Sequence, residues 1–201
     1  MRHGIQFPPI GAGLRRDSRR LALRLLALLL FALTPDSASA QENPYRVKAA
    51  FLRNFAHYVG WPSQALPDNG SPWCIGILGP DPFGEILDDT LRGRSEQGRG
   101  FRIVRAERLS ELPLCQLVYI GYTEASQRRQ ALAELRTKPV LTVGDAPEFL
   151  TEGGVIGFIV DERVGMNINL DQARAVSLTI QTKMLEVSSG VLFNGALRRM
   201  R

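Results

Sequence analysis

The stretch GFIVDERVGMNINLDQARAVSLTIQTKML, residues 157–185, decides the fold because its apolar spacing changes halfway along. In the first half, apolar residues alternate with polar ones on both sides of a turn at residues 161–163, which is typical of paired strands. In the second half they recur every three or four residues, which is typical of a helix. The helical stripe consists of Ala173, Val176, Ile180, Met184 and Val187. We therefore expect a β-hairpin that runs directly into one closing helix.

The boundary between hairpin and helix is expected at Asn169. Its side chain can accept a hydrogen bond from an N–H of the first helical turn, and Gln172, three residues later, can reach back as in a capping box. Asp171 falls in the same turn, where the helix dipole favours a carboxylate. These three residues predict a helix that begins directly after Asn169.

The closing helix also has a second apolar side. Leu178 and Leu185 lie seven residues apart, nearly opposite the main stripe, with Gln181 beside them. A helix that is apolar on two sides is either enclosed within its domain or offers one side to a partner. The sequence leaves both alternatives open.

The rest of the chain alternates between strand and helix patterns. Helices are expected over residues 44–59, 83–91 and 124–136, and strands over 73–79, 101–105, 114–120, 140–143 and 155–160. This order predicts an α/β fold with a mostly parallel sheet flanked by helices, and an antiparallel hairpin near the C-terminal end. In the helix over 124–136, Arg128 and Arg129 are expected on the solvated face.

The first 40 residues have the pattern of a signal peptide. Arginines precede the apolar run at residues 21–33, and Ala38-Ser39-Ala40 offers a small-residue cleavage site. The run is shorter than the roughly 20 residues that a membrane span needs, although a retained signal anchor is the alternative. We therefore expect a signal peptide over residues 1–40 and a single periplasmic domain over residues 41–201.

Net charge argues against a nucleic-acid-binding role. The whole chain has 25 basic and 20 acidic residues, and the first 40 residues contain six arginines and two of the acids. The remaining domain therefore has 19 basic and 18 acidic side chains. A nearly neutral domain lacks the positive surface that nucleic-acid binding requires.

Cys74 and Cys115 are the only cysteines, and each lies at the start of a predicted strand. In the common doubly wound order these first and third strands are neighbours, so the two residues would lie at the same end of the sheet. Export to an oxidising compartment favours a disulfide between them. Two separate buried thiols remain the alternative, because sequence alone does not give the geometry.

The chain shows little sign of catalytic machinery. It has no CxxC motif, serine elbow, His-rich metal spacing or Walker loop, and His57 falls on the exposed face of a predicted helix. The adjacent acids Asp88 and Asp89 do not face each other on a helix, so we expect them on the solvated surface. We expect no catalytic residues, metal or cofactor.

Four blocks of sequence, in order, resemble the YfiR family. They are KAAFLRNFAHYVGWP (48–62), CIGILGPDPFG (74–84), VLTVGD followed by GGVIGFIV (140–145 and 153–160), and INL running into an Ala- and Lys-containing helix (168–185). The resemblance implies an α/β domain that forms homodimers and pairs Cys74 with Cys115. It also implies a periplasmic repressor of a membrane diguanylate cyclase that controls cyclic di-GMP signalling and biofilm formation, and an outer-membrane lipoprotein that withdraws it.

The resemblance directs attention to the hairpin and closing helix as the partner surface. The candidate partner-binding residues are Asn167, Asn169, Leu178, Gln181 and Leu185. Asn167 departs from the family pattern, which has an acidic residue there, and the tail after Val187 departs from it too. The main rival function is a periplasmic small-molecule binder with its pocket at the strand ends. A thiol-redox enzyme is the third alternative.

Overall fold

A computed structural model describes residues 43–68 and 70–200, which form one compact unit around an eight-stranded sheet. The strand order is β10-β9-β7-β6-β5-β4-β2-β3. The strands are β2 (Trp73–Leu78), β3 (Phe101–Ala106), β4 (Leu117–Ile120), β5 (Leu141–Gly144), β6 (Ile156–Val160), β7 (Val164–Asn169), β9 (Gly190–Phe193) and β10 (Ala196–Arg199). Strands β2 to β6 are parallel, β7 is antiparallel to β6, and β10 is antiparallel to β9. The predicted α/β fold with a mostly parallel sheet is confirmed.

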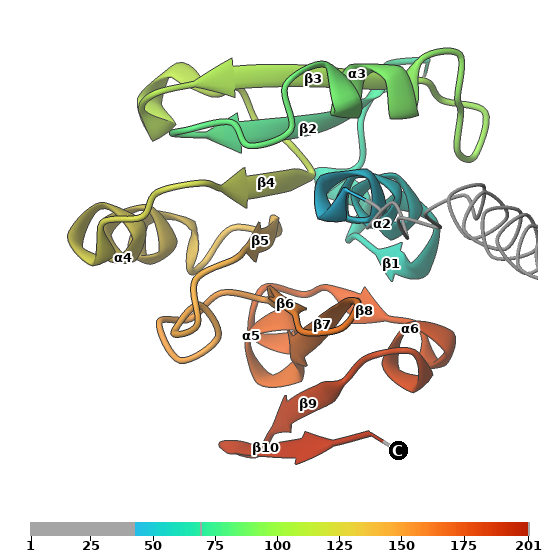
Figure 1. The fold of residues 1–201 in the computed structure, drawn as a ribbon. Coiled ribbons are helices and arrows are strands. Elements are labelled where there is room, and N and C mark those ends of the chain that lie inside the picture. The colour runs from blue at the N-terminus through green and yellow to red at the C-terminus, as the bar shows by residue number, and fades with distance from the viewer. Residues whose placement is uncertain (1–42, 69, 201) are drawn as a thin grey trace, which may run out of the picture. The chain divides into compact units, whose positions relative to one another are not determined.

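Helices cover both faces of this sheet. They are α2 (Pro44–Tyr58), α3 (Glu85–Leu91), α4 (Ala125–Leu135), α5 (Leu170–Ala175) and α6 (Thr182–Glu186). Figure 1 shows α4 on one side of the stacked strands and α2 with α6 on the other. Short pieces complete the order: β1 (Val59–Gly60), η1 (Ser63–Ala65), η2 (Leu109–Glu111) and β8 (Thr179–Ile180). Among the described residues, no helix is long and apolar enough to cross a bilayer.

The central strands are buried on both faces, which explains their nearly continuous apolar sequences. Alternate residues of β2 and β4 face opposite helical layers. Ile75 and Ile77 belong to the cluster that contains Leu52 of α2, whereas Val118 packs in the cluster that contains Leu132 of α4. The sheet therefore separates two apolar cores.

The sheet reverses its direction of growth between β2 and β4. The chain passes from β2 to β3 on one side, and β4, β5 and β6 then follow on the other side. Gly79, directly after β2, has φ +80°, and a Cβ there would lie 2.6 Å from the ring of Tyr122. A Cβ at Gly121, directly after β4, would lie 2.0 Å from the carbonyl oxygen of Pro80. The loops after β2 and β4 are thus in close contact, and larger residues at the two glycines would force them apart.

The closing segment is not the single helix that its spacing predicts. Helix α5 ends at Ala175, and Ser177 has φ 60°, which turns the chain. The Leu178 N–H then donates to the Ala173 carbonyl at 2.8 Å, and β8 pairs antiparallel with β1 before α6 begins. Thr179 and Ile180 are β-branched and pair with β1, which overrides the place of Ile180 in the helical stripe. The prediction of one continuous helix is therefore wrong.

The C-terminal tail adds a hairpin that the sequence analysis did not predict. Asp171 of α5 accepts hydrogen bonds from the N–H groups of Gly195 (2.9 Å) and Asn194 (3.0 Å) in the β9–β10 turn, and these bonds lower the pKa of its carboxyl. The guanidinium of Arg174 lies 4.8 Å from the ring centre of Phe193. These contacts hold β9 and β10 against α5. All four residues of β10 are exposed along this edge of the sheet.

Candidate functional site

Asn169 lies at the start of α5, as predicted, and has a structural role there. Its Oδ1 accepts from the Gln172 N–H at 2.9 Å, and its Nδ2 donates to the Leu150 carbonyl at 3.1 Å. The side chain of Gln172 does not complete the capping box, because it donates instead to the Arg136 carbonyl at 3.0 Å. Asn169 is buried, and its bond to Leu150 ties the end of β7 to the segment before β6. One half of the predicted cap, the bond from the Gln172 N–H, is confirmed.

Leu178 belongs to the core. It is 3% exposed and lies in the cluster that contains Val176 and Ile180. Of the two alternatives that the sequence left open for Leu178, the structure shows the enclosed one, and the helix that would have carried it is broken before Leu178. Asn167 is half-buried in β7, opposite Gly157 of β6 and Gly190 of β9.

Gln181 and Leu185 remain nearer the surface. Gln181 is exposed at the start of α6, and its Nε2 donates to the His57 carbonyl at 3.0 Å. Leu185 is half-buried and packs against the edge of the core. Of the five candidate partner-binding residues, the structure brings these two together at the junction of α6 with the end of α2.

A groove runs between α2 and α6, with β7 as its floor, and has a volume of about 390 Å³. We call it the α2–α6 groove, and its lining residues are Phe51, Asn54, Phe55, Tyr58, Met166, Lys183, Met184, Glu186 and Val187. The rings of Phe51 and Phe55 are stacked, with their centres 6.2 Å apart. Val187 is 67% exposed. The groove therefore presents aromatic and aliphatic surface to solvent.

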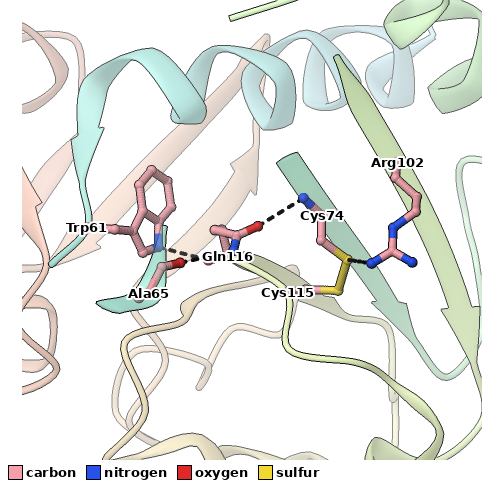
Figure 2. Close-up of a disulfide and its surroundings, with 6 residues drawn as sticks. All are labelled: Trp61, Ala65, Cys74, Arg102, Cys115 and Gln116. Atoms are coloured by element: carbon pink, nitrogen blue, oxygen red, sulfur yellow. Dashed lines mark hydrogen bonds between the residues drawn. A yellow bond between two sulfur atoms is a disulfide. The ribbon is translucent and has the colours of Figure 1, made fainter. Parts of the chain in front are cut away.

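The predicted disulfide is present at the amino ends of β2 and β4 (Figure 2). The Cα atoms of Cys74 and Cys115 are 4.6 Å apart, both residues are buried, and the two strands are direct neighbours as expected. The Cys74 N–H donates to Gln116 Oε1 at 3.0 Å, Gln116 Nε2 donates to the Ala65 carbonyl at 3.0 Å, and Trp61 Nε1 donates to the Gln116 carbonyl at 3.1 Å. Disulfide and glutamine together fasten the segment after α2 to the end of the sheet.

The surroundings of the disulfide are those of a structural bond. Arg102 makes a polar contact with the bond, with its Nη2 3.7 Å from Cys74 Sγ. His57 lies elsewhere, with its Nδ1 2.8 Å from Glu96 Oε1. A thiol enzyme requires an accessible sulfur beside a base, and this arrangement supplies neither.

A buried polar cluster joins α2 to the carboxyl end of the sheet. Lys48 Nζ lies 2.7 Å from Asp145 Oδ2, and the Tyr119 hydroxyl donates to the same oxygen at 2.9 Å. Burial, and then the negative charge of Asp145, raise the pKa of Tyr119 well above its usual range, so the phenol stays protonated. The other carboxylate oxygen, Asp145 Oδ1, is buried without a hydrogen-bond partner among the described residues. The cluster thus contains one unfilled acceptor.

Arg128 is buried, contrary to the expectation that it lies on a solvated face. Its side chain is 5% exposed, and its Nη2 donates to Glu152 Oε1 at 2.9 Å. Nη1 donates to the carbonyls of Tyr122 and Thr123, at 3.3 and 3.0 Å. The hydrogen bond to Glu152 raises the pKa of Arg128. Arg129, the next residue, is 62% exposed as predicted.

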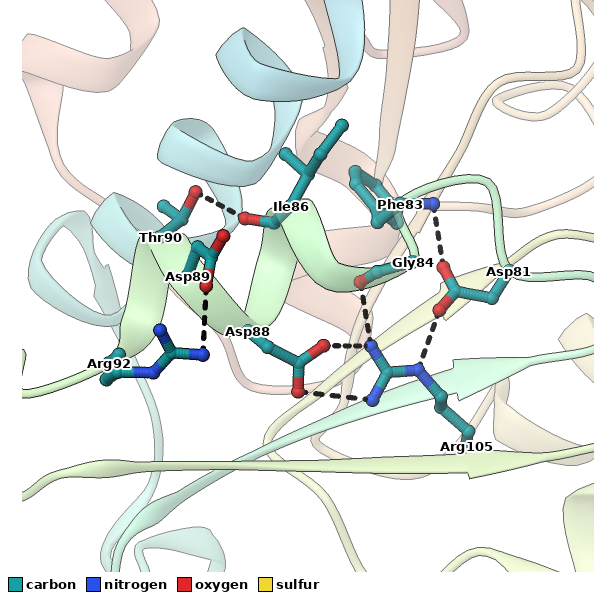
Figure 3. Close-up of polar contacts among 9 residues, drawn as sticks. All are labelled: Asp81, Phe83, Gly84, Ile86, Asp88, Asp89, Thr90, Arg92 and Arg105. Atoms are coloured by element: carbon teal, nitrogen blue, oxygen red, sulfur yellow. Dashed lines mark hydrogen bonds and ion pairs between the residues drawn. The ribbon is translucent and has the colours of Figure 1, made fainter.

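Asp88 is also partnered, although the sequence suggested only a solvated surface. Arg105 of β3 bridges the loop after β2 and helix α3 (Figure 3): its Nε lies 2.7 Å from Asp81 Oδ2 and its Nη2 lies 2.6 Å from Asp88 Oδ2. Asp81 Oδ1 accepts from the Phe83 N–H at 2.8 Å. The loop that leaves β2 is therefore fixed by charge-assisted hydrogen bonds.

Asp81, Arg128 and Asp145 from these pairs line a cavity of about 730 Å³ at the carboxyl ends of β2, β4 and β5. We call it the carboxyl-edge cavity, and its lining includes Tyr45, Pro80, Asp81, Tyr122, Arg128, Asp145 and Glu148. Sequence reasoning placed a rival ligand pocket at the strand ends but missed Lys48 and Arg128. A usable signal was present, since each is a charged residue among residues that face the core of an amphipathic helix.

The model of the YfiR/HmsC-like family matches residues 45–189. The match begins in α2 and ends immediately before β9, so it includes the α2–α6 groove, both cysteines and the carboxyl-edge cavity.

Proposed function

Because the chain belongs to the YfiR/HmsC-like family, we propose that it is an exported regulatory protein, not an enzyme, that binds and represses a membrane diguanylate cyclase. The observation that carries the proposal is the extent of the match. It covers the described unit from its first helix, α2, to α6, the helix before the C-terminal hairpin. In this proposal, repression lowers cellular cyclic di-GMP and so limits biofilm formation.

The α2–α6 groove is the surface proposed to contact the periplasmic part of the cyclase. Two blocks that carry the family resemblance meet there: Phe51 and Tyr58 come from the first, and Lys183 and Met184 come from the last. Large apolar side chains in a central pocket commonly supply most of the binding energy at protein interfaces. Val187, which is exposed and lines the groove, takes the place of Leu178 as the apolar contact, and the half-buried Leu185 lies beside the groove on α6.

The proposed partners, an outer-membrane lipoprotein and a second copy of the protein, would affect how the α2–α6 groove binds the cyclase. An outer-membrane lipoprotein that withdraws the protein from the cyclase would compete with the cyclase for the protein, or favour a form that does not bind it. A homodimer would also bury apolar surface. Dimer formation depends on the concentration of this protein alone, whereas binding to the cyclase depends also on the concentration of the cyclase, so the two contacts can be distinguished.

Two groove variants and one matched control test the proposal. Val187→Asp and Tyr58→Asp place a charge in the groove, whereas Leu114→Asp changes a leucine that is 83% exposed and does not line it. Loss of an apolar anchor typically costs more than about 1 kcal/mol, so binding to the purified periplasmic domain of the cyclase should weaken at least about fivefold. Cellular cyclic di-GMP should rise in the groove variants and stay unchanged with Leu114→Asp.

The outcome is interpretable only for folded variants, so circular dichroism accompanies each measurement. If both groove variants are folded and repress as the unaltered protein does, the groove is not the cyclase surface. If they become monomeric and still bind the cyclase, the groove is the contact between two copies.

A further inference from the structure

The sheet has two edge strands, β3 and β10, which differ in how they are covered. Most residues of β3 are half-buried, and its Arg105 is bound by Asp81 and Asp88. At the other edge, all four residues of β10 are exposed. Figure 1 shows β10 at the outer end of the stack of strands. Of the two edges, β10 is therefore the one that lies open to another chain.

The ladder between β9 and β10 shows which backbone groups of β10 point outward. The Met200 N–H, directly after β10, donates to the Ser189 carbonyl at 3.1 Å, so this pair is hydrogen-bonded within the hairpin. Hydrogen-bonded pairs alternate with non-hydrogen-bonded pairs along an antiparallel ladder. The N–H and C=O groups of Leu197 and Arg199 therefore face away from β9, where an added strand would bond to them.

The side chains along this edge are positively charged. Arg198 and Arg199 are both exposed, and they lie on opposite faces of the strand because successive side chains alternate. Within the part of the chain that the structure describes, neither guanidinium pairs with a carboxylate. Asp171 contacts the hairpin, but its carboxylate is already bonded to two N–H groups of the β9–β10 turn. A strand added here would meet an unpaired positive charge on each face.

These charges determine which kind of strand fits the edge. A second copy of β10 would bring four arginines together, and like charges on facing strands are destabilising. An uncharged strand would remove water from both guanidinium groups without supplying a partner. An acidic strand would place opposite charges across the ladder while its backbone hydrogen-bonds to the open edge. Charge complementarity thus favours an acidic chain in an extended conformation.

We propose that β10 is a docking edge for an acidic segment of another protein, which binds in an extended conformation and becomes the outermost strand of the sheet. Its backbone hydrogen-bonds to Leu197 and Arg199, and its carboxylates pair with Arg198 and Arg199. None of these three residues lines the α2–α6 groove. The proposal is therefore independent of the cyclase contact proposed above, and either can fail alone.

Three capped seven-residue peptides test the proposal on the full secreted protein. The first consists of valine and glutamate, with two glutamates after each of its first two valines. The second has lysine in place of glutamate, and the third is the first peptide with methylated backbone nitrogens. Calorimetric titration should detect binding of the acidic peptide and none of the basic one. The methylated peptide keeps its charge but loses its backbone donors, so it should bind at least about tenfold more weakly.

Two variants separate the role of charge from that of the backbone. Arg198→Glu combined with Arg199→Glu should abolish binding of the acidic peptide and permit binding of the basic one. Leu197→Pro keeps both arginines and removes one outward N–H, so it should weaken binding of the acidic peptide at least about fivefold. The matched control is Arg92→Glu combined with Arg94→Glu, because both residues are exposed and lie in the segment that leads to the opposite edge strand. It makes the same change of charge and should leave binding unchanged.

Circular dichroism accompanies each variant, and the methylated peptide alone decides the role of the backbone if Leu197→Pro does not fold. The proposal is overturned if the acidic peptide does not bind, if methylation leaves its affinity unchanged, or if the charge-reversed variant still binds it as the unaltered protein does. Sedimentation with vesicles of equal parts phosphatidylglycerol and phosphatidylcholine tests a membrane surface as the occupant. Binding to these vesicles without binding to the acidic peptide would replace the proposed protein segment with a lipid surface.

Discussion

Leu178 owes its burial to the residue before it. Ser177 adopts a left-handed backbone conformation, and the Leu178 N–H returns to the Ala173 carbonyl, so the side chain points into the core instead of continuing a helical face. A left-handed serine is uncommon and carries no strong sequence signal. Four of the five residues in the predicted helical stripe are buried. They reach the core from two short helices and a strand, not from one continuous helix.

The first prediction follows from that burial. Leu178→Ala should lower the free energy of unfolding by about 2–5 kcal/mol, because it removes a buried side chain and leaves a cavity. Leu178→Asp should prevent folding, since it buries an unpaired charge. Urea denaturation monitored by circular dichroism measures both. Leu197→Ala, at a leucine that is 55% exposed, is the control and should change stability by less than about 0.5 kcal/mol. A folded Leu178→Asp protein would contradict the assignment to the core.

Local residue contacts were predictable from the sequence, and distant ones were not. Asn169 and Gln172 are three residues apart, so the cap between them could be inferred from spacing. Lys48 and Asp145 are 97 residues apart, and only the assembled sheet brings them together. Arg128 and Glu152 also meet only in the folded protein. The sequence analysis therefore placed Arg128 on a solvated face, although it belongs to a buried ion pair.

Among the elements, the parallel strands were predicted to within a few residues because each is a short apolar run bounded by turn residues. The C-terminal hairpin was missed because β10 has no buried face from which alternation could be read. Its signal was in the turn instead. Asn194 and Gly195 both have positive φ, and Asn-Gly between two strands is the strongest short-range sign of a hairpin.

The disulfide supplies the prediction at the level of elements. It joins β2 to the segment before β4 across 41 residues, and the chain-entropy model assigns about 4 kcal/mol to a loop of that length. Cys74→Ser combined with Cys115→Ser should therefore lower the free energy of unfolding by roughly that amount, measured by urea denaturation. Reduction of the unaltered protein provides a second route to the same state. Equal stability of the oxidised protein and the double variant would refute a stabilising bond.

At the scale of the whole molecule, the expected signal peptide lies outside the described residues. We predict that export removes residues 1–40 and leaves a protein that begins at Gln41, because an arginine-rich start and an apolar run precede Ala38-Ser39-Ala40. Intact mass spectrometry of the periplasmic fraction measures this directly. Recovery of a membrane-bound form that still contains residues 21–33 would show that the leader is retained as an anchor.

The C-terminal hairpin has a consequence for any shortened version of this protein. The family match ends at residue 189, so a chain cut at that boundary would lack both β9 and β10. The edge of β7 from Asn167 to Asn169 would then lose its pairing with β9, and the surface beneath Val191 would be open to water. An uncovered strand edge pairs readily with other chains, and the arginines at positions 198 and 199 that now border the sheet would be gone. We therefore expect a chain cut at residue 189 to aggregate more readily than the full chain.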